Sequence, residues 1–593
     1  ATIENVGTRD GRMFGALRAG GLVGQTAGGT VLRNVHSGRT VVEGSLSGGV
    51  VGEATDGTTI SNVYSTNALS FGGYRGGIVG RLLRSTMTGA VARGSVSSTD
   101  AVGTGSLVAI GAFSTMSSSY WDLQMGGFPV SSWVGPAFQA TPLDTLEQSL
   151  SQASYADLDF VNTWFMVDGF IRPVLRSEWQ PKINYAHQLQ LMAMDLDASY
   201  TLERDIDMQA SVGWQEQFAP IGTYIEGAAD PYASAFTGTF DGKGHSIQYL
   251  AVTTAGAAGL FGATSGATIR NLTLGSLVRG TNDVGGLVGN AAGTRIENVS
   301  AATAVYGVTG AGGLVGSASN SSLENVSVTA FVNADARAGG LVGAVHGSTI
   351  TNASVAGVTG ITSASVTAFD MGGGLAGYVD GGSTISNSHA TGSVGGRQYA
   401  GGLVGQNYGT ISKAYATGQV DALDDHAGGL VGYNAGTITD AYATGIIGFR
   451  YASGYSGAYS GGLVGSNSGI IQRSYATGAV KGDGPIGGLA GDNSGGVHES
   501  FWNTTTSAQA TGCGAGSGLC AAEGLTTAEM ADPFRFLDAG WNFADTWGTP
   551  KSGGAPLLGG MTTAALYDNY VRLSGDILRS YGDMVSTGGI GLD

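Results

Sequence analysis

Residues 401–418 read GGLVGQNYGTISKAYATG, and close copies of both halves of this stretch recur along the chain. Most copies of the pentapeptide GGLVG follow the previous copy by 26 to 28 residues, with longer steps of 34 residues after Gly339 and 33 after Gly428. The copies begin at Gly20, Gly48, Gly76, Gly285, Gly312, Gly339, Gly373, Gly401, Gly428, Gly461 and Gly487, with a weaker one at Ala258. A period of this length predicts structural units that stack on one another.

The second half of the stretch has the form I-x-N-x-x-A and alternates with the pentapeptide. Its copies begin at Ile3, Leu32, Ile60, Ile269, Ile296, Leu323, Ile350, Ile385, Ile411, Ile438, Ile471 and Val497. The copy at Ile3 has no pentapeptide before it. We therefore expect the repeat to begin before residue 1 and the chain to be a fragment or a processed product.

Short β-branched runs divided by glycines predict an all-β fold, a right-handed parallel β-helix (β-solenoid) with about 27 residues per coil. Each coil would hold three short strands, at GLVG, at ISxAYA and at the following GxV. Neighbouring coils would pair at a spacing of about 4.8 Å. Glycine this frequent argues against helix, where it costs about 1 kcal/mol per site relative to alanine.

The repeat also separates interior from exterior positions. The columns of Ile411 and Ala414 hold apolar and small residues in successive coils and are expected to face the interior. The column between them holds Asn5, Asn34, Asn62, Asn298, Asn325 and Asn352, but also Lys413, Asp440, Arg473 and Glu499. Because unpaired charges are costly to bury, this column should lie at a bend or face water, with its asparagines stacked as a ladder.

The column of Tyr415 is expected to point outward and becomes aromatic towards the C-terminal end. It holds Tyr415, Tyr442, Tyr475 and Phe501. Cross-strand aromatic pairs stabilise sheets without binding anything, so we interpret this aromatic ladder as structural first and as a ligand surface second.

Composition excludes several classes of partner. The 593 residues carry a net charge of −17, so no basic surface is available for nucleic acid or for anionic membranes. No apolar run approaches the length that spans a bilayer, and no signal peptide opens the chain. Only 12% of residues are charged and 105 are glycine, which is common in extracellular β-rich repeat proteins.

The repeat stops near residue 120 and restarts near residue 236, which predicts two modules. We assign residues 1–125 to a first solenoid module that is truncated at its N-terminus, and 126–181 to its closing cap or a linker. We assign 182–250, with a short helix in HQLQLMAMDL, to the N-terminal cap of a second module, and 251–502 to its solenoid. Residues 503–558, with the Cys513/Cys520 loop, would close it, and 559–593 would be a linker or the start of a further region. Caps are expected because open solenoid ends expose unpaired strand edges.

The two cysteines, Cys513 and Cys520, lie in the short loop sequence GCGAGSGLC. This spacing predicts a local disulfide and an oxidising compartment. Two unpaired thiols are the alternative, and a zinc site would need more ligands than these two residues supply.

The stretch at 401–418 closely resembles the GLUG motif, found in filamentous-haemagglutinin-like adhesins of the two-partner secretion type and in non-catalytic parts of some bacterial immunoglobulin A1 peptidases. LERDIDM (202–208), FAPIG (218–222) and FTGTFDGKGHSIQYL (236–250) resemble the opening of such modules. The resemblance covers most of residues 1–560. It implies a β-helical rod on the outer surface of a Gram-negative cell, exported through an outer-membrane secretion partner.

The leading functional hypothesis is an adhesin or biofilm-matrix module that binds surface glycans, exopolysaccharide, or a host or neighbouring cell surface. Its candidate site is the long coil between Gly428 and Gly461, because tyrosine with glycine and serine is typical of adaptable binding loops. The site residues would be Phe449, Arg450, Tyr451, Tyr455 and Tyr459. The alternative is a tolerated insertion whose tyrosines pack on the neighbouring coil.

Two other hypotheses stay open. The chain could be a passive stalk or a self-associating filament subunit. A polysaccharide-degrading enzyme would need two carboxylates at a fixed separation. Asp421, Asp424 and Asp425 cluster, and Asp370 lies in the other long coil, but nothing pairs them with a second acid. We therefore expect neither an enzyme nor a required cofactor; calcium at Asp421, Asp424 and Asp425 is an alternative that lacks a defined ligand spacing.

Overall fold

The computed structural model describes residues 1–69, 73–96, 103–125, 129–134, 138–209, 217–358, 364–422, 425–448, 459–550 and 553–559, together with the short strands β58 (Tyr567–Asp568), β59 (Tyr570–Leu573) and β60 (Ile577–Ser580). It is all-β, with 55% strand and 7% helix, and forms a parallel β-solenoid of about 18 turns with about 27 residues per turn. This confirms the predicted fold class. No helix in the described ranges is long and apolar enough to cross a membrane.

The chain divides into two compact units. The first contains Ala1–Gln180, Tyr185–Met194 and Gln209–Ala219, and the second contains Pro181–Asn184, Asp195–Met208 and Pro220–Asp593. Tyr185–Met194 and Gln209–Ala219 were expected in the N-terminal cap of the second module. Leu191, within Tyr185–Met194, joins Ile171 and Val174 in one apolar cluster of the first unit.

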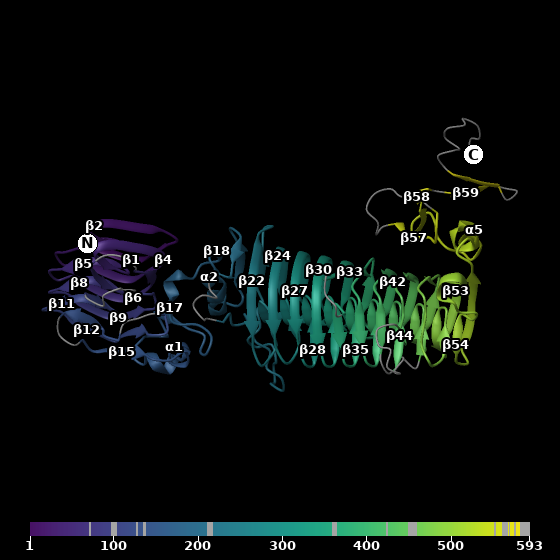
Figure 1. Ribbon diagram of the computed structural model, residues 1–593, viewed down its shortest axis with the longest axis horizontal. Helices are drawn as coiled ribbons and strands as arrows, with labels where there is room; N and C mark the ends of the chain where they lie inside the picture. The colour runs from purple at the N-terminus through teal and green to yellow at the C-terminus, as the bar shows by residue number, and fades with distance from the viewer. Residues whose placement is uncertain are drawn as a thin grey trace, which may run out of the picture. The chain divides into compact units, whose positions relative to one another are not determined.

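In the first unit, parallel strands from successive coils build two sheets (Figure 1). One sheet contains β1 (Thr2–Arg9), β2 (Arg12–Gly20), β4 (Val31–Gly48), β6 (Thr59–Ala68), β7 (Tyr74–Gly76), β9 (Thr86–Ala92), β10 (Thr104–Gly105), β12 (Thr115–Ser117), β13 (Ser119–Asp122) and β15 (Ala140–Leu143). The other contains β3 (Val23–Thr26), β5 (Val51–Thr55), β8 (Val79–Leu83), β11 (Val108–Ala112) and β14 (Ser132–Val134).

After these coils, the first unit continues with short elements that close it. They are α1 (Leu146–Leu150), a 3-10 turn at Gln152–Tyr155, the antiparallel pair β16 (Trp164–Phe165) and β17 (Val174–Leu175), 3-10 turns at Arg176–Glu178 and Met192–Met194, and α2 (Ala186–Leu191). The segment HQLQLMAMDL thus supplies most of one short helix, followed by a 3-10 turn.

The second unit has three parallel sheets. The largest contains β18 (Lys182–Ile183), β19 (Ser199–Leu202), β20 (Ile206–Asp207), β21 (Thr239–Asp241), β22 (Ser246–Thr253), β24 (Thr268–Arg279), β27 (Arg295–Tyr306), β30 (Ser322–Ala334), β33 (Thr349–Gly357), β34 (Val366–Ala368), β37 (Thr384–Ser386), β38 (His389–Ala390), β39 (Val394–Gly396), β42 (Thr410–Ala416), β43 (Val420–Ala422), β46 (Thr437–Ala443), β49 (Ile470–Gln472), β50 (Tyr475–Ala476), β53 (Gly496–Asn503) and β55 (Leu519–Leu525).

The other two sheets complete each coil. One contains β23 (Phe261–Ser265), β26 (Val288–Ala292), β29 (Val315–Ser319), β32 (Val342–His346), β36 (Ala376–Val379), β41 (Val404–Asn407), β45 (Val431–Asn434), β48 (Val464–Asn467), β52 (Ala490–Asn493) and β54 (Cys513–Ala515). The other contains β25 (Val284–Gly285), β28 (Gly310–Gly312), β31 (Arg337–Gly339), β35 (Met371–Gly373), β40 (Tyr399–Gly401), β44 (His426–Gly428), β47 (Tyr459–Gly461) and β51 (Ile486–Gly487).

The coils differ from the three-strand prediction in one respect. GGLVG does not form a single strand: Gly401 ends β40, Gly402 and Leu403 form a turn, and β41 begins at Val404 in a different sheet. A Cβ on Gly402, within this turn, would collide with the carbonyl oxygen of Gly429 in the next coil. Glycine is therefore required at this turn by the close approach of successive coils.

The column between the Ile411 and Ala414 positions forms a bend, as predicted. Its members adopt positive φ angles, for example 55° at Asn298 and 52° at Asp440. Asparagine tolerates this conformation well, and its amides bond along the solenoid axis. Asn325 Nδ2 donates to Asn298 Oδ1 at 3.3 Å, and Asn352 Nδ2 donates to Asn325 Oδ1 at 3.0 Å.

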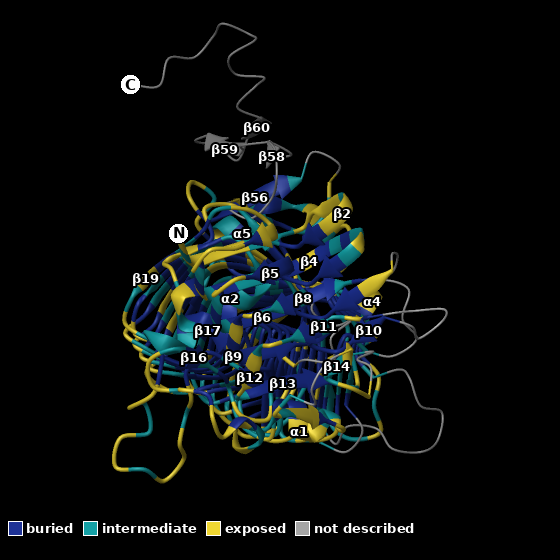
Figure 2. Ribbon diagram, turned by 90° about the vertical axis from the view of Figure 1, so that its left-hand side faces the viewer, coloured by how far each residue is buried: buried dark blue, intermediate teal, exposed yellow. Residues whose placement is uncertain are grey.

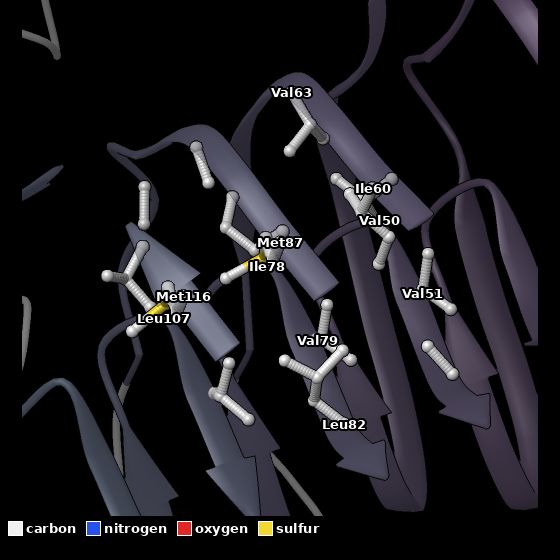
Figure 3. Packing of buried hydrophobic residues seen from close by; sticks show 14 of the residues in the cluster. Val50, Val51, Ile60, Val63, Ile78, Val79, Leu82, Met87, Leu107 and Met116 are labelled. Carbon is white, nitrogen blue, oxygen red and sulfur yellow. The ribbon is translucent and has the colours of Figure 1, made fainter. Parts of the chain in front are cut away.

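The core follows the predicted interior columns. Ile411, Ile438 and Ile471 and the alanines Ala414 and Ala441 are fully buried. In the first unit, Ile60, Ile78 and Met87 pack between the two sheets (Figure 3). Strands β5, β8 and β11 accordingly contribute mostly buried residues (Figure 2). Removing such side chains from water at about 25 cal/mol per Å² stabilises each coil on its neighbours.

Candidate functional site: an aromatic face on the second unit

Of the five residues of the predicted binding loop, the structure describes only Tyr459. Phe449, Arg450, Tyr451 and Tyr455 lie outside the described residues. Tyr459 begins β47 and is half-buried, and its ring stacks on that of His426 with centroids 5.1 Å apart. Tyr459 therefore belongs to a larger aromatic arrangement.

Three rings form a first column across neighbouring coils. Tyr399, His426 and Tyr459 occupy paired positions on β40, β44 and β47. Tyr399 and His426 stack at 5.0 Å between centroids, which continues the contact of His426 with Tyr459. Parallel in-register pairing thus places one ring per coil on the same side of the solenoid.

Four more rings form a second row beside the first. His346 and Tyr378 lie 5.6 Å apart, Tyr378 and Tyr408 5.7 Å, and Tyr408 and Tyr433 5.9 Å. Tyr433 joins the two rows, at 6.1 Å from Tyr399. We call these seven residues the aromatic face: His346, Tyr378, Tyr399, Tyr408, His426, Tyr433 and Tyr459. Tyr408 is 41% exposed and the other six rings are half-buried, so the face can be reached from solvent.

An open groove of about 600 Å³ begins at Tyr408, the one ring of the second row that lines it. Its floor holds the equivalent glycines Gly409, Gly436, Gly469 and Gly495. A Cβ on any of the last three would collide with the carbonyl oxygen of the glycine one coil earlier. The close coil spacing therefore excludes side chains from the floor and leaves it open across successive coils.

The two walls of the groove differ. One carries Thr410, Thr437 and Ile470, and the other carries Tyr408, Ala435 and Ser468. The Tyr433 hydroxyl lies 3.0 Å from Ser468 Oγ, which links the aromatic face directly to this second wall. Aromatic rings, hydroxyl groups and backbone thus line one continuous surface.

Carboxylates lie among the rings. Asp425 Oδ1 is 3.0 Å from His426 Nδ1, and Asp492 also acts on this imidazole. Burial nevertheless lowers the pKa of His426, which favours the neutral ring at neutral pH. Burial, together with Asp425 and Asp370, raises the pKa of Tyr399. The face is therefore aromatic and acidic in character.

The aromatic ladder is not available to a ligand at its C-terminal end. Tyr415 stacks on Tyr442 at 4.8 Å and Tyr442 on Tyr475 at 5.0 Å, both with 3° between the ring planes. We expected this column to face outward, but Tyr442, Tyr475 and Phe501 are buried.

The reason is the closing segment of the second unit, whose Phe536, Trp541 and Trp547 pack on the ladder. Its helix α5 (Pro533–Asp538) lies near the last coils (Figure 1). Trp541 and Trp547 contact Tyr475, whose hydroxyl donates to the Pro556 carbonyl at 2.8 Å. The ladder anchors this segment on the side of the last coils.

The cysteines and the acidic cluster lie elsewhere on the second unit. Cys513 and Cys520 form a disulfide that joins β54 to β55, the strands of the last coil. Of the acidic cluster, Asp421 accepts from Gln419 Nε2 at 3.1 Å and Asp425 contacts His426, whereas Asp424 lies outside the described residues. Within the described ranges, no group of three His, Cys, Asp or Glu side chains is placed to hold a metal ion.

The first unit contains a buried ionic cluster around Glu178. Its carboxylate accepts from the Tyr64 hydroxyl at 2.6 Å and lies 2.7 Å from His187 Nε2, with His36 Nε2 at 3.3 Å and Arg9 Nη2 at 3.6 Å. Burial opposes ionisation of Glu178, but the two histidines and Arg9 hold its pKa below the usual value. Burial and Arg9 lower the pKa of His187 to about 4.

This cluster joins three parts of the first unit. Arg9, His36 and Tyr64 come from the coils, Glu178 from the segment that follows β17, and His187 from α2. The cluster therefore fixes the closing segment of the first unit to its coils.

Comparison with known proteins supports the repeat assignment. Residues 371–395, 396–421 and 426–448 match the family described as the GLUG motif, which confirms the motif. No curated protein matches the chain.

Two solved structures are similar to parts of the chain. One is named IgA1 Protease, with 19% identity, a TM-score of 0.26, and coverage of 49% of this chain and 21% of its own length. The other is described as a candidate immunoglobulin A1 protease from Bacteroides ovatus, with 17% identity, a TM-score of 0.30, and coverage of 64% of this chain and 92% of its own. This chain spans about a fifth of the first of these proteins.

Proposed function

We propose that this protein is an extracellular attachment module that binds glycans through the aromatic face and has no catalytic role. The observation that carries the proposal is the continuity of seven rings over successive coils, open to solvent beside a groove. Tyrosine offers a large flat apolar surface together with a polar hydroxyl, a combination suited to sugar rings. No cofactor is part of the proposal.

The proposed setting is the outer surface of a Gram-negative cell, reached through an outer-membrane secretion partner. The GLUG motif and the β-solenoid support an extracellular protein. The Cys513–Cys520 disulfide supports an oxidising compartment, since such bonds persist outside the cytosol. The partners would be surface glycans or exopolysaccharide on the same, a neighbouring or a host cell.

A glycan array tests this proposal. We expect saturable binding by the parent chain and its loss in the double variant Tyr408→Ala/Tyr459→Ala, which removes one ring from each row. Tyr306→Ala is the matched control, because Tyr306 is a half-buried tyrosine on β27 whose ring contacts Phe331, outside the aromatic face. Binding that survives the double variant would contradict the site, and absence of binding to every glycan would contradict the function.

A passive stalk is the second candidate, favoured by the in-register pairing of successive coils over much of the second unit. A stalk needs no ligand, so it predicts no glycan binding by the parent or by either variant.

A further inference from the structure

We propose that the groove and the aromatic face together bind one extended polysaccharide of amino sugars, lying parallel to the solenoid axis with successive sugars on successive coils. This inference rests on the proposed glycan binding and specifies the shape and charge of the ligand.

The direction of the ligand follows from the floor of the groove. Gly409, Gly436, Gly469 and Gly495 repeat the same backbone surface once per coil. Coils of a parallel solenoid are spaced by about 4.8 Å, so the four glycines span about 14 Å along the axis. A single small sugar would use only one step of this repeat, whereas a linear polymer would use all of them.

The walls repeat with the same period. Thr410 and Thr437 occupy paired positions on β42 and β46 and present a hydroxyl group in each of two neighbouring coils. On the other wall, the Tyr408 ring is followed one coil later by Ala435, which leaves room beside the ring, and then by Ser468. Tyr433 extends the aromatic surface over this gap through its contact with Ser468. This wall therefore presents a ring, a gap and a hydroxyl group on three successive coils, where consecutive sugars of a polymer could lie.

The charge of the ligand follows from the side chains around the rings. Asp425 and Asp492 act on His426, and Asp380 lies beside His346 at the other end of the face, 3.5 Å from its Nδ1. These carboxylates, in a chain of net charge −17, disfavour an anionic polymer. Ammonium groups are attracted both to carboxylates and to the faces of tyrosine rings.

A polymer that combines flat sugar rings with ammonium groups meets both conditions. Neutral polysaccharides can stack on the aromatic rings but gain nothing from the carboxylates. Uronic-acid polysaccharides carry negative charges that the carboxylates repel. The surface therefore fits a glucosamine-type polymer better than either.

The test uses β-1,4-linked glucosamine oligosaccharides as the probe, with the full chain in calorimetric titrations. We expect affinity to rise about tenfold or more from the disaccharide to the octasaccharide, because the longer chain occupies more coils. N-acetylation of the same octasaccharide, which removes its charge, should weaken binding about tenfold. Higher salt should reduce the difference between the two.

Variants locate the effect. Tyr408→Ala and Tyr433→Ala should each weaken octasaccharide binding about tenfold, whereas Tyr306→Ala should leave it unchanged. Asp492→Asn should weaken binding of the glucosamine octasaccharide and leave that of its N-acetylated form unchanged. Circular dichroism of each variant establishes that the coils remain folded.

Several results would overturn the inference while leaving the proposed function intact. Equal affinity for the disaccharide and the octasaccharide would exclude a ligand that spans coils. Preference for alginate, or for the N-acetylated oligosaccharide, would exclude a ligand recognised by its free ammonium groups. Equally tight, tyrosine-dependent binding of polylysine would show that the surface recognises cationic chains in general. If no glycan binds at all, the proposed function itself fails.

Discussion

The buried cluster around Glu178 allows a sharp prediction for the variant Glu178→Gln. Glutamine has nearly the same shape and keeps one oxygen to accept from the Tyr64 hydroxyl, now 2.6 Å from Glu178 Oε1. It places an amide donor where the carboxylate now lies 2.7 Å from His187 Nε2, and it removes the negative charge that faces Arg9. The side chains of Glu178 and Arg9 are only 4% and 10% exposed, so water can replace little of the lost interaction between them.

The expected loss of stability is about 3 kcal/mol. A hydrogen bond to a charged group contributes about 1.5–3 kcal/mol, and removing one partner of a buried ion pair costs about 3–5 kcal/mol in measured cases. We take the lower end of the second range because glutamine keeps the bond with Tyr64. Since about 1.4 kcal/mol corresponds to a factor of ten, amide exchange in the closing segment should accelerate about a hundredfold.

Hydrogen exchange followed by mass spectrometry measures this directly in peptides that cover β16 and β17. The matched control is Asp56→Asn, which removes an exposed ion pair with Arg84 in the same unit and should change stability by about 1 kcal/mol or less. If exchange in β16 and β17 of Glu178→Gln stays within about threefold of the parent, the cluster does not hold the closing segment and the reasoning is refuted.

Three further predictions follow from other contacts. Acidification should destabilise the first unit, because the folded-state pKa values of His187 (about 4, against 6.5) and Glu178 (below 4.5) are both lowered. The contribution of these two groups to stability is complete above about pH 6.5 and is lost as pH falls, by about 3 kcal/mol from His187 alone. Constant stability between pH 7 and 4 in pulse proteolysis would contradict this. Gly436→Ala should lower the free energy of unfolding, measured by urea denaturation, by about 1–3 kcal/mol, because its Cβ would collide with the Gly409 carbonyl. Gly256→Ala, whose Cβ meets nothing within 4 Å, should lower it far less, and equal effects would refute the packing argument. Cys513→Ser should lower stability by about 2–3 kcal/mol, the value for closing a short loop, and a melting temperature unchanged by this variant or by reductant would contradict it.

The solenoid could be predicted from sequence because the same physical constraint acts once per coil. Ile411 and its equivalents must fill the interior in each coil, and Gly402 and its equivalents must let the next coil approach. The bend at Asn298 could be predicted as well, because the charged members of that column cannot be buried. What could not be predicted from columns alone was the turn at Gly402 and Leu403, which places Gly401 and Val404 in different sheets.

Only Tyr459 of the aromatic face was predicted from the sequence, although the sequence contains a pattern that points to three of its rings. Tyr399, His426 and Tyr459 each lie two residues before a copy of the pentapeptide, so aligning the copies brings them into one column. Tyr408 and Tyr433 lie at different distances after their copies, and only the geometry of the turn brings those two rings together. The burial of Tyr475 could not be predicted from the columns either, because it depends on Trp541, Trp547 and Pro556, which follow it by 66 to 81 residues.

One structural constraint connects stability to the proposed binding surface. Coils that pair directly through their backbones leave no room for a Cβ at Gly436, and the same absence of side chains opens the groove beside Tyr408. A larger residue at such a glycine would push against the backbone of the preceding coil and so displace the floor of the groove. A variant such as Gly436→Ala would therefore lose stability and polymer binding together, whereas Tyr433→Ala should lose binding with a much smaller change in stability, since its ring is only half-buried. Comparing the two variants separates the contribution of the groove from that of the rings, because only the first changes the floor on which the polymer would lie.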